Sequence, residues 1–206
     1  MKKLLGIIIS TLVICNVFSA DLKSVCDGLS KTPITKGDFT QIKTINAKGR
    51  QLKSSGVFII SELGIMWKTL KPFPSNLIVT ENAMIQIAAD GKKNVMSAAD
   101  NQIFQNISKT LRSVFAGDSK ELENSFNVDF ENKDKGLWTV ILTPKDSTIA
   151  SIMKSLELSG SSINSQVTLL SLEMQETSNN KIRYDFTNQT YPKELSADEK
   201  NIFAAD

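Results

Sequence analysis

Side chains that could perform acid–base or nucleophilic chemistry are scarce in this sequence. There is no histidine among the 206 residues, which removes the commonest general base and metal ligand. Asp118, Glu121 and Glu123 could pair for acid chemistry, but they follow Gly117 in a segment rich in Lys and Glu, which indicates the solvated face of a helix. Gly160-Ser161-Ser162 lacks the next glycine that a nucleophile elbow requires. We therefore expect a protein that is not an enzyme, with no catalytic residue, no metal site and no cofactor.

The N-terminal segment has the pattern of a cleaved secretory signal. Lys2 and Lys3 precede an apolar run, Leu4–Val13, and Ser19 and Ala20 offer small residues for cleavage. The run is too short to span a bilayer comfortably. We expect a signal peptide over residues 1–19 and one domain over residues 20–206. Without Lys2 and Lys3, the 24 basic and 22 acidic residues become 22 against 22, so the charge predicts no nucleic-acid partner.

The two cysteines allow different interpretations. Cys15 would leave with the signal peptide, so the mature chain would keep only Cys26 and form no internal disulfide. Cys26 fits a small buried residue on a helix, with a reactive thiol as the alternative. Leu12-Val13-Ile14-Cys15 resembles a lipobox, although Ile14 is larger than the residue normally found before the cysteine. The alternative to a soluble protein is thus a membrane-anchored one, lipidated at Cys15.

Apolar periodicity indicates mostly strands with a few helices. The spacing of the apolar residues predicts helices at Leu22–Leu29, Ala98–Ala116 and Ser147–Leu156. Asp90-Gly91 predicts a tight hairpin before Val95-Met96. Alternating segments predict antiparallel strands at Phe39–Lys43, Val57–Ser61, Ile65–Leu70, Leu77–Thr80, Met84–Ala88, Val128–Phe130, Leu137–Thr143, Val167–Glu176 and Lys181–Asn188.

A sheet of about ten strands must curl or close, because an open twisted sheet of that size rarely stays flat. Curling leaves a concave apolar face, and the helices are the elements available to cover it. The covered face could be a solid core or a ligand cavity. Val57-Phe58-Ile59-Ile60 is apolar on both faces of its strand, and Met153 can repack around a ligand. Both features favour a cavity.

Several short motifs together resemble one protein family. In chain order they are Gly37-Asp38-Phe39-Thr40-Gln41, Gly56-Val57-Phe58 with Trp67 and Pro72, Val114-Phe115-Ala116-Gly117-Asp118, Phe130 with Trp138, Leu142-Thr143-Pro144-Lys145, and Lys181-Ile182-Arg183-Tyr184-Asp185-Phe186 before Pro192 and Leu195-Ser196. Their order and spacing resemble the LolA family of periplasmic lipoprotein carriers, from about Leu22 to Phe203.

The resemblance implies a mainly β fold, an incomplete, half-open antiparallel β-barrel with a helical lid over a hydrophobic cavity. The cavity would hold the acyl chains of lipoproteins in transit between the inner and outer membranes. By this resemblance the cavity residues are Phe39, Phe58, Ile65, Trp67 and Ile87, and the lid residues are Ile103, Ile107, Leu111, Phe115, Ile149, Ile152 and Met153.

The same resemblance implies a periplasmic monomer whose partners are acylated lipoproteins or lipids, an inner-membrane release complex and an outer-membrane acceptor. Another acylated or glycolipid cargo is the alternative. One departure concerns the lid. Family members carry a lid-locking arginine before the tryptophan strand, whereas this chain has Ile60-Ser61-Glu62-Leu63 there, and Ile65 replaces an aromatic residue. How the lid is controlled is therefore left open.

Overall fold

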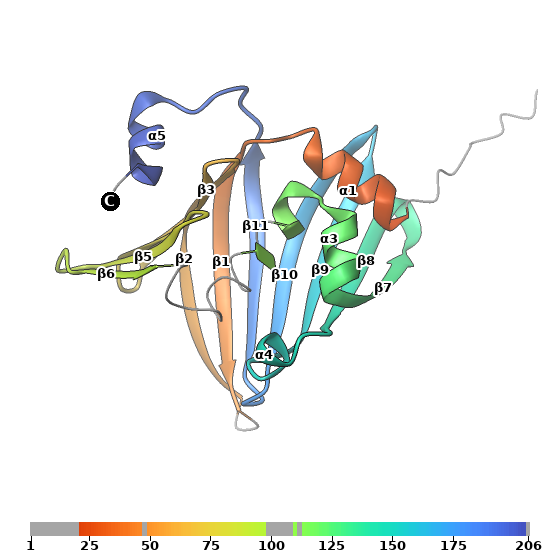
Figure 1. The fold of residues 1–206 in the computed structure, drawn as a ribbon, viewed down its shortest axis with the longest axis horizontal. Coiled ribbons are helices and arrows are strands. Elements are labelled where there is room, and N and C mark those ends of the chain that lie inside the picture. The colour runs from red at the N-terminus through yellow and green to blue at the C-terminus, as the bar shows by residue number, and fades with distance from the viewer. Residues whose placement is uncertain (1–20, 47–48, 98–108, 111–112, 205–206) are drawn as a thin grey trace, which may run out of the picture.

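A single antiparallel sheet dominates the computed structural model, which describes residues 21–46, 49–97, 109–110 and 113–204 (Figure 1). Within those residues the sheet has eleven strands in the order β6-β5-β4-β3-β2-β1-β11-β10-β9-β8-β7. The strands are β1 Thr35–Ile45, β2 Arg50–Ser61, β3 Gly64–Lys71, β4 Ser75–Val79, β5 Ala83–Ala88, β6 Lys93–Ser97, β7 Phe126–Asn132, β8 Leu137–Pro144, β9 Met153–Ile163, β10 Gln166–Glu176 and β11 Lys181–Thr190.

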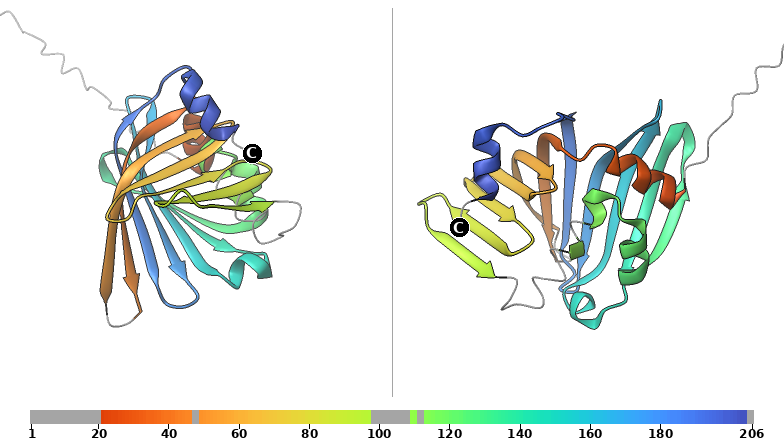
Figure 2. Two further views of the ribbon diagram at one scale, coloured as in Figure 1. Left: turned by 90° about the vertical axis from the view of Figure 1, so that its left-hand side faces the viewer. Right: turned by 45° about the horizontal axis from the view of Figure 1, so that its top comes forward.

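The sheet is strongly curved and does not close (Figure 2). Strands β1 and β11 pair at its centre, where Phe39 lies opposite Phe186 and Gln41 opposite Tyr184. Strands β6 and β7 form its two free edges. The expected fold class, mainly β with helices and an open, barrel-like antiparallel sheet, is confirmed. The hairpin at Asp90-Gly91 is confirmed too, since β5 pairs with β6 and Gly91 has a φ of 81°.

Short helices accompany the sheet, and most lie against its concave face (Figures 1 and 2). Helix α1 spans Leu22–Ser30 and begins with a capping box between Asp21 and Ser24. The others are α3 Ser119–Ser125, α4 Ser147–Ala150, α5 Ala197–Phe203 and the 3-10 turn η2 Asp134–Gly136. Residues 109–110 and 113–116 are also helical.

Two apolar clusters lie on opposite faces of the sheet, because successive strand residues point to opposite sides. The inner cluster fills the concave face and includes Phe39, Phe58, Ile65, Trp67, Val114, Trp138, Leu142, Met153, Leu172 and Phe186. The outer cluster lies on the convex face under α5 and consists of Ile34, Ile59, Met66, Ile78, Ile85 and Leu195, with Ile87, Ile202 and Phe203 packed against it. The segment Val57-Phe58-Ile59-Ile60 is apolar on both faces because Phe58 and Ile60 pack in the inner cluster and Ile59 packs in the outer one.

The predicted helix Ser147–Leu156 is wrong beyond its first turn. Asp146 caps α4 by accepting hydrogen bonds from Thr148 and Ile149, but the helix ends at Ala150, and β9 begins at Met153. The residues after Met153 pair along β10, where Leu156 lies opposite Met174 and Leu158 opposite Leu172. Pairing with two neighbouring strands outweighed the helical spacing of four apolar residues.

The remaining helix predictions have mixed outcomes. Leu22–Leu29 is confirmed by α1. Of the predicted helix Ala98–Ala116, residues 98–108 and 111–112 lie outside the described residues, and the described remainder is helical. Helix α5 and strand β9 were not predicted. Ser196 starts α5 with a capping box to Glu199, a signal that the sequence does contain.

Candidate functional site

The concave face holds an apolar hollow of about 230 Å3. Side chains of β3, β4, β9, β10 and β11 form its wall, and α4 with the turn after it closes one side. Its lining residues are Trp67, Leu77, Thr110, Ile149, Ile152, Met153, Leu156, Leu172, Met174, Ile182 and Tyr184. None of the lining residues that the structure describes is charged at neutral pH, so the hollow suits an apolar ligand.

A second hollow, also of about 230 Å3, opens beside the first. It is bounded by α1, the β2–β3 turn and the helical residues 113–116, with Leu29, Ile60, Ile65 and Phe115 among its lining residues. Phe115 also packs edge-on against Trp67, with ring centroids 5.7 Å apart. Its ring therefore lies between the second hollow and a wall residue of the first.

Four of the five predicted cavity residues gather in the inner cluster, but they do not share one hollow. Trp67 lines the first hollow, Ile65 the second, and Phe58 a narrow space of about 20 Å3 next to Phe115 and Phe186. Phe39 packs against Tyr184, with centroids 5.9 Å apart. The structure does not bring Ile87 to them, because Ile87 packs against the outer cluster on the opposite face.

Four of the seven predicted lid residues lie in the described part of the chain, and each of these four lines one of the hollows. Ile149, Ile152 and Met153 line the first hollow, although Met153 does so as the first residue of β9. Phe115 lines the second. Ile103, Ile107 and Leu111 lie outside the described residues.

Tyr184 and Phe186 lie beside Trp67 and Phe58, although neither was among the predicted cavity residues. Their rings stack with an interplanar angle of 10°, and Tyr184 lies 5.8 Å from Trp67 between ring centroids. The signal was present in the sequence, since Ile182, Tyr184 and Phe186 are alternate residues of one strand. Such a stripe faces one side of a sheet.

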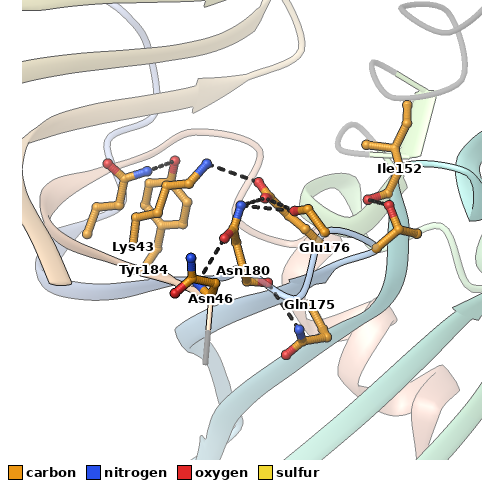
Figure 3. Close-up of polar contacts among 10 residues, drawn as sticks. Lys43, Asn46, Ile152, Gln175, Glu176, Asn180 and Tyr184 are labelled. Atoms are coloured by element: carbon orange, nitrogen blue, oxygen red, sulfur yellow. Dashed lines mark hydrogen bonds and ion pairs between the residues drawn. The ribbon is translucent and has the colours of Figure 1, made fainter. Parts of the chain in front are cut away.

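Polar side chains form a group of contacts toward the ends of β1 and β10, and this group includes Tyr184 (Figure 3). Gln41 Nε2 donates to Tyr184 Oη at 2.7 Å, and Lys43 Nζ lies 3.2 Å from a carboxylate oxygen of Glu176. Asn180 Nδ2 donates to the other Glu176 oxygen at 2.7 Å. Burial works to raise the pKa of Glu176, but hydrogen bonds from Asn180, Ser178 and Lys43 outweigh it and hold that pKa below its usual value.

Two of the three acidic candidates, Asp118 and Glu121, have structural roles. Asp118 caps α3 by accepting a hydrogen bond from the backbone N–H of Glu121. Glu121 pairs with Lys109 at 2.8 Å and accepts from Ser125, and these contacts lower its pKa.

The other chemical candidates are also explained by packing. Cys26 is buried in the inner cluster, and burial raises its pKa to about 11, so its thiol stays protonated. Gly160 lies beneath Trp138, where a Cβ atom would overlap the indole ring. Within the described ranges, no group of three His, Cys, Asp or Glu side chains is placed to hold a metal ion. No helix among those same residues has the length and apolarity needed to cross a membrane.

Three solved structures align with most of this chain at low sequence identity. A DUF1329 family protein from Desulfovibrio piger aligns with a TM-score of 0.51 at 11% identity, covering 85% of this chain and 92% of that protein. A LolA superfamily protein from Nitrosomonas europaea has a TM-score of 0.46 at 8% identity over 90% and 98% of the two chains. A putative outer membrane lipoprotein-sorting protein domain from Vibrio parahaemolyticus has a TM-score of 0.46 at 11% identity over 89% and 98%.

The sequence was also compared with curated proteins and with protein families. No curated protein matches this chain. Residues 30–202, however, match the family described as outer membrane lipoprotein carrier protein LolA. The matched segment contains the whole sheet and most of the lining of both hollows. This chain therefore belongs to the LolA family.

Proposed function

We propose that this protein is a periplasmic carrier that binds the acyl chains of lipoproteins and transfers them from the inner to the outer membrane. The observation that carries the proposal is the apolar hollow of about 230 Å3 on the concave face of the open sheet, whose described lining residues are uncharged. Members of the family are carriers of lipoproteins rather than enzymes. Burying acyl chains there would stabilise the complex by about 25 cal/mol per Å2 of apolar surface.

The size of the hollow indicates how cargo would enter. Binding pockets for drug-sized ligands usually measure about 300–1,000 Å3, so the first hollow alone would hold only part of an acyl chain. The second hollow lies next to it, across the Trp67 and Phe115 rings. Displacement of Phe115 would join the two, and we propose that the helical residues 113–116 act as part of the lid.

Location and partners belong to the same proposal. The signal-like segment over residues 1–19 and the family's periplasmic setting support a periplasmic monomer. It would receive cargo from an inner-membrane release complex and give it to an outer-membrane acceptor. Mass spectrometry of the mature N-terminus separates this soluble form from the alternative, a receptor lipidated at Cys15.

Binding is tested by titrating the purified protein with an environment-sensitive apolar dye and displacing the dye with acyl ligands. We expect Ile182→Gln, which places an amide in the lining of the first hollow, to weaken acyl binding about tenfold. Ile163→Gln is the matched control, because Ile163 is exposed at the end of β9. Equal binding by both variants would contradict the assignment of the hollow.

Transfer needs a separate experiment. Membrane vesicles that contain an acylated lipoprotein are incubated with the carrier, and soluble complex is collected after removal of the vesicles. We expect the acylated lipoprotein in the soluble fraction and the same lipoprotein without its acylated cysteine to be left unbound. Recovery of a different acylated lipid or a glycolipid, with no lipoprotein, would favour the alternative cargo.

A further inference from the structure

The indole N–H of Trp67 has no hydrogen-bond partner within the described residues, although its nitrogen is buried. The side chain is only 9% exposed and lines the first hollow. Leaving a buried donor unpaired is unfavourable, because the group loses its hydration without gaining a partner. A ligand that brought an acceptor atom into this hollow would recover that loss.

Tyr184 supplies a second donor in the same hollow. Its Oη already accepts a hydrogen bond from Gln41 Nε2 at 2.7 Å, and Gln41 Oε1 in turn accepts from Ser54 Oγ at 2.6 Å. Figure 3 shows this contact at Tyr184. Within the described residues the phenol proton of Tyr184 has no acceptor, so it can donate to a ligand. Burial raises the pKa of Tyr184 to about 12, so this proton stays in place at neutral pH.

The surroundings select the kind of acceptor. Apart from Thr110, the remaining lining residues within the described ranges are apolar, and a carboxylate placed among these residues would lose its hydration without gaining a counter-ion from them. The nearby cation Lys43 is already paired with Glu176 at 3.2 Å. A neutral carbonyl oxygen can accept two hydrogen bonds and carries no net charge.

We propose that the Trp67 indole N–H and the Tyr184 hydroxyl together bind the carbonyl oxygen of an ester- or amide-linked acyl chain. Both rings line the same hollow, and their centroids lie 5.8 Å apart. This proposal rests on the acyl-binding function above and adds a chemical preference to it. The hollow selects acyl esters and amides over plain hydrocarbons and over free carboxylates.

The test compares a saturated fatty-acid methyl ester with the n-alkane of equal length and with the free fatty-acid anion, each displacing a bound apolar dye. The wild-type protein should bind the ester most tightly. Tyr184→Phe and Trp67→Phe each remove one donor and keep an aromatic ring. Each should reduce the ester-to-alkane affinity ratio roughly fivefold, the factor that corresponds to a net hydrogen bond of about 1 kcal/mol.

Trp138→Phe is the matched control for the lost indole N–H. Trp138 Nε1 is also buried and unpartnered in the described part of the chain, but Trp138 lines neither hollow. This variant should leave the ester-to-alkane ratio unchanged, whatever it does to stability.

The outcomes separate the two proposals. Carbonyl recognition is overturned if wild type binds ester and alkane equally. It is also overturned if Tyr184→Phe, Trp67→Phe and Trp138→Phe all have the same ester-to-alkane affinity ratio. In either case the proposed acyl-carrier function is unaffected. If the folded wild-type protein binds none of the ligands, the proposed function itself is overturned. Ester preference that falls in both donor variants and survives in Trp138→Phe supports the inference.

Discussion

Trp67 and Trp138 are both buried in the inner cluster, yet their surroundings differ. Trp138 is 1% exposed and packs directly over Gly160. Trp67 contacts the rings of Phe115 and Tyr184 and has the first hollow on another side. Truncation at the two positions should therefore have different consequences, because atoms that face a void make fewer packing contacts.

The first prediction compares these truncations. Trp138→Ala should lower the free energy of unfolding by roughly 3–5 kcal/mol, as expected for an aromatic side chain in a tight core. Trp67→Ala should cost less and yet weaken acyl binding, because wall area is lost at about 25 cal/mol per Å2. Urea denaturation and dye displacement measure the two effects. A Trp67→Ala protein that is strongly destabilised but binds normally when folded would contradict the assignment.

At the residue scale the sequence could predict which residues are buried more easily than which face they occupy. Phe39, Phe58, Ile65 and Trp67 all lie in the inner cluster. Ile87 is equally apolar, but its position on β5, opposite Asn76 of β4, points it to the outer face. The face of the sheet on which Ile87 lies depends on the pairing register of strands joined by three turns. An error of one residue in that register would place Ile87 on the opposite face.

At the scale of elements, β9 shows how pairing partners decide a structure. Ile149, Ile152, Met153 and Leu156 have helical spacing, but the chain is a strand from Met153 onward. Leu156, Leu158 and Gly160 also have the spacing of a strand, and β8 and β10 hold them from both sides. Local spacing alone could not choose between the two periods, because the deciding contacts come from distant residues.

Gly160 is the position in β9 where a side chain would do most harm. A Cβ atom there would overlap both the Trp138 ring and the backbone oxygen of Thr168. We predict that Gly160→Ala lowers the free energy of unfolding by about 1–3 kcal/mol, a typical penalty for overpacking. Chemical denaturation measures this loss. Ser161→Ala, at the partly buried neighbour in the same strand, is the control and should have a small effect. Equal stability of Gly160→Ala and wild type would show that Trp138 can move aside.

Helix α5 is held to the sheet partly by an ion pair. Lys36 Nζ on β1 lies 2.6 Å from Glu199, and the two side chains are 27% and 23% exposed. The hydrogen bond from Lys36, followed by that from the Ser196 backbone, lowers the pKa of Glu199. A lowered folded-state pKa means that the ionised carboxylate stabilises the fold. That contribution is fully present above the usual glutamate value of 4.5 and is lost as the pH falls through the lowered value.

The third prediction follows from the lowered pKa of Glu199. Glu199→Gln should be less stable than wild type at neutral pH by up to about 1 kcal/mol, the upper range for a partly exposed ion pair. The difference should shrink as the pH falls below the usual glutamate value. Urea denaturation of both proteins over a pH series measures it, with Asp198→Asn at the exposed neighbour as the control. A difference that does not change with pH would show that the ion pair does not hold α5.

At the scale of the whole molecule, the hollows result from a curved sheet that its helices cover unevenly. Helix α1 contacts β10, and α3 leads into β7, so both lie over one half of the concave face (Figure 1). Among the described residues near β3, Phe115 is the aromatic side chain that approaches the other half, through its contact with Trp67. A sheet of this size could be predicted to curl, but the uneven cover depends on how each helix packs.

The last prediction tests whether Phe115 separates the two hollows. Phe115→Ala removes the ring that packs against Trp67 and Phe186 and lines the second hollow. The two hollows of about 230 Å3 each should then join, and binding should shift toward longer acyl chains. Dye displacement by a series of fatty-acid methyl esters of increasing length measures the shift.

The matched control for this prediction is Phe130→Ala. Phe130 is also partly buried against the inner cluster, but it lies on the edge strand β7 and lines neither hollow. Its truncation should reduce stability and leave the chain-length profile as in wild type. In Phe115→Ala the affinity for the longest esters should rise relative to the shortest, since the added chain is buried rather than left in water. An identical profile in wild type and Phe115→Ala would mean that Phe115 does not gate the space between the hollows, and that longer cargo must enter by displacing another element.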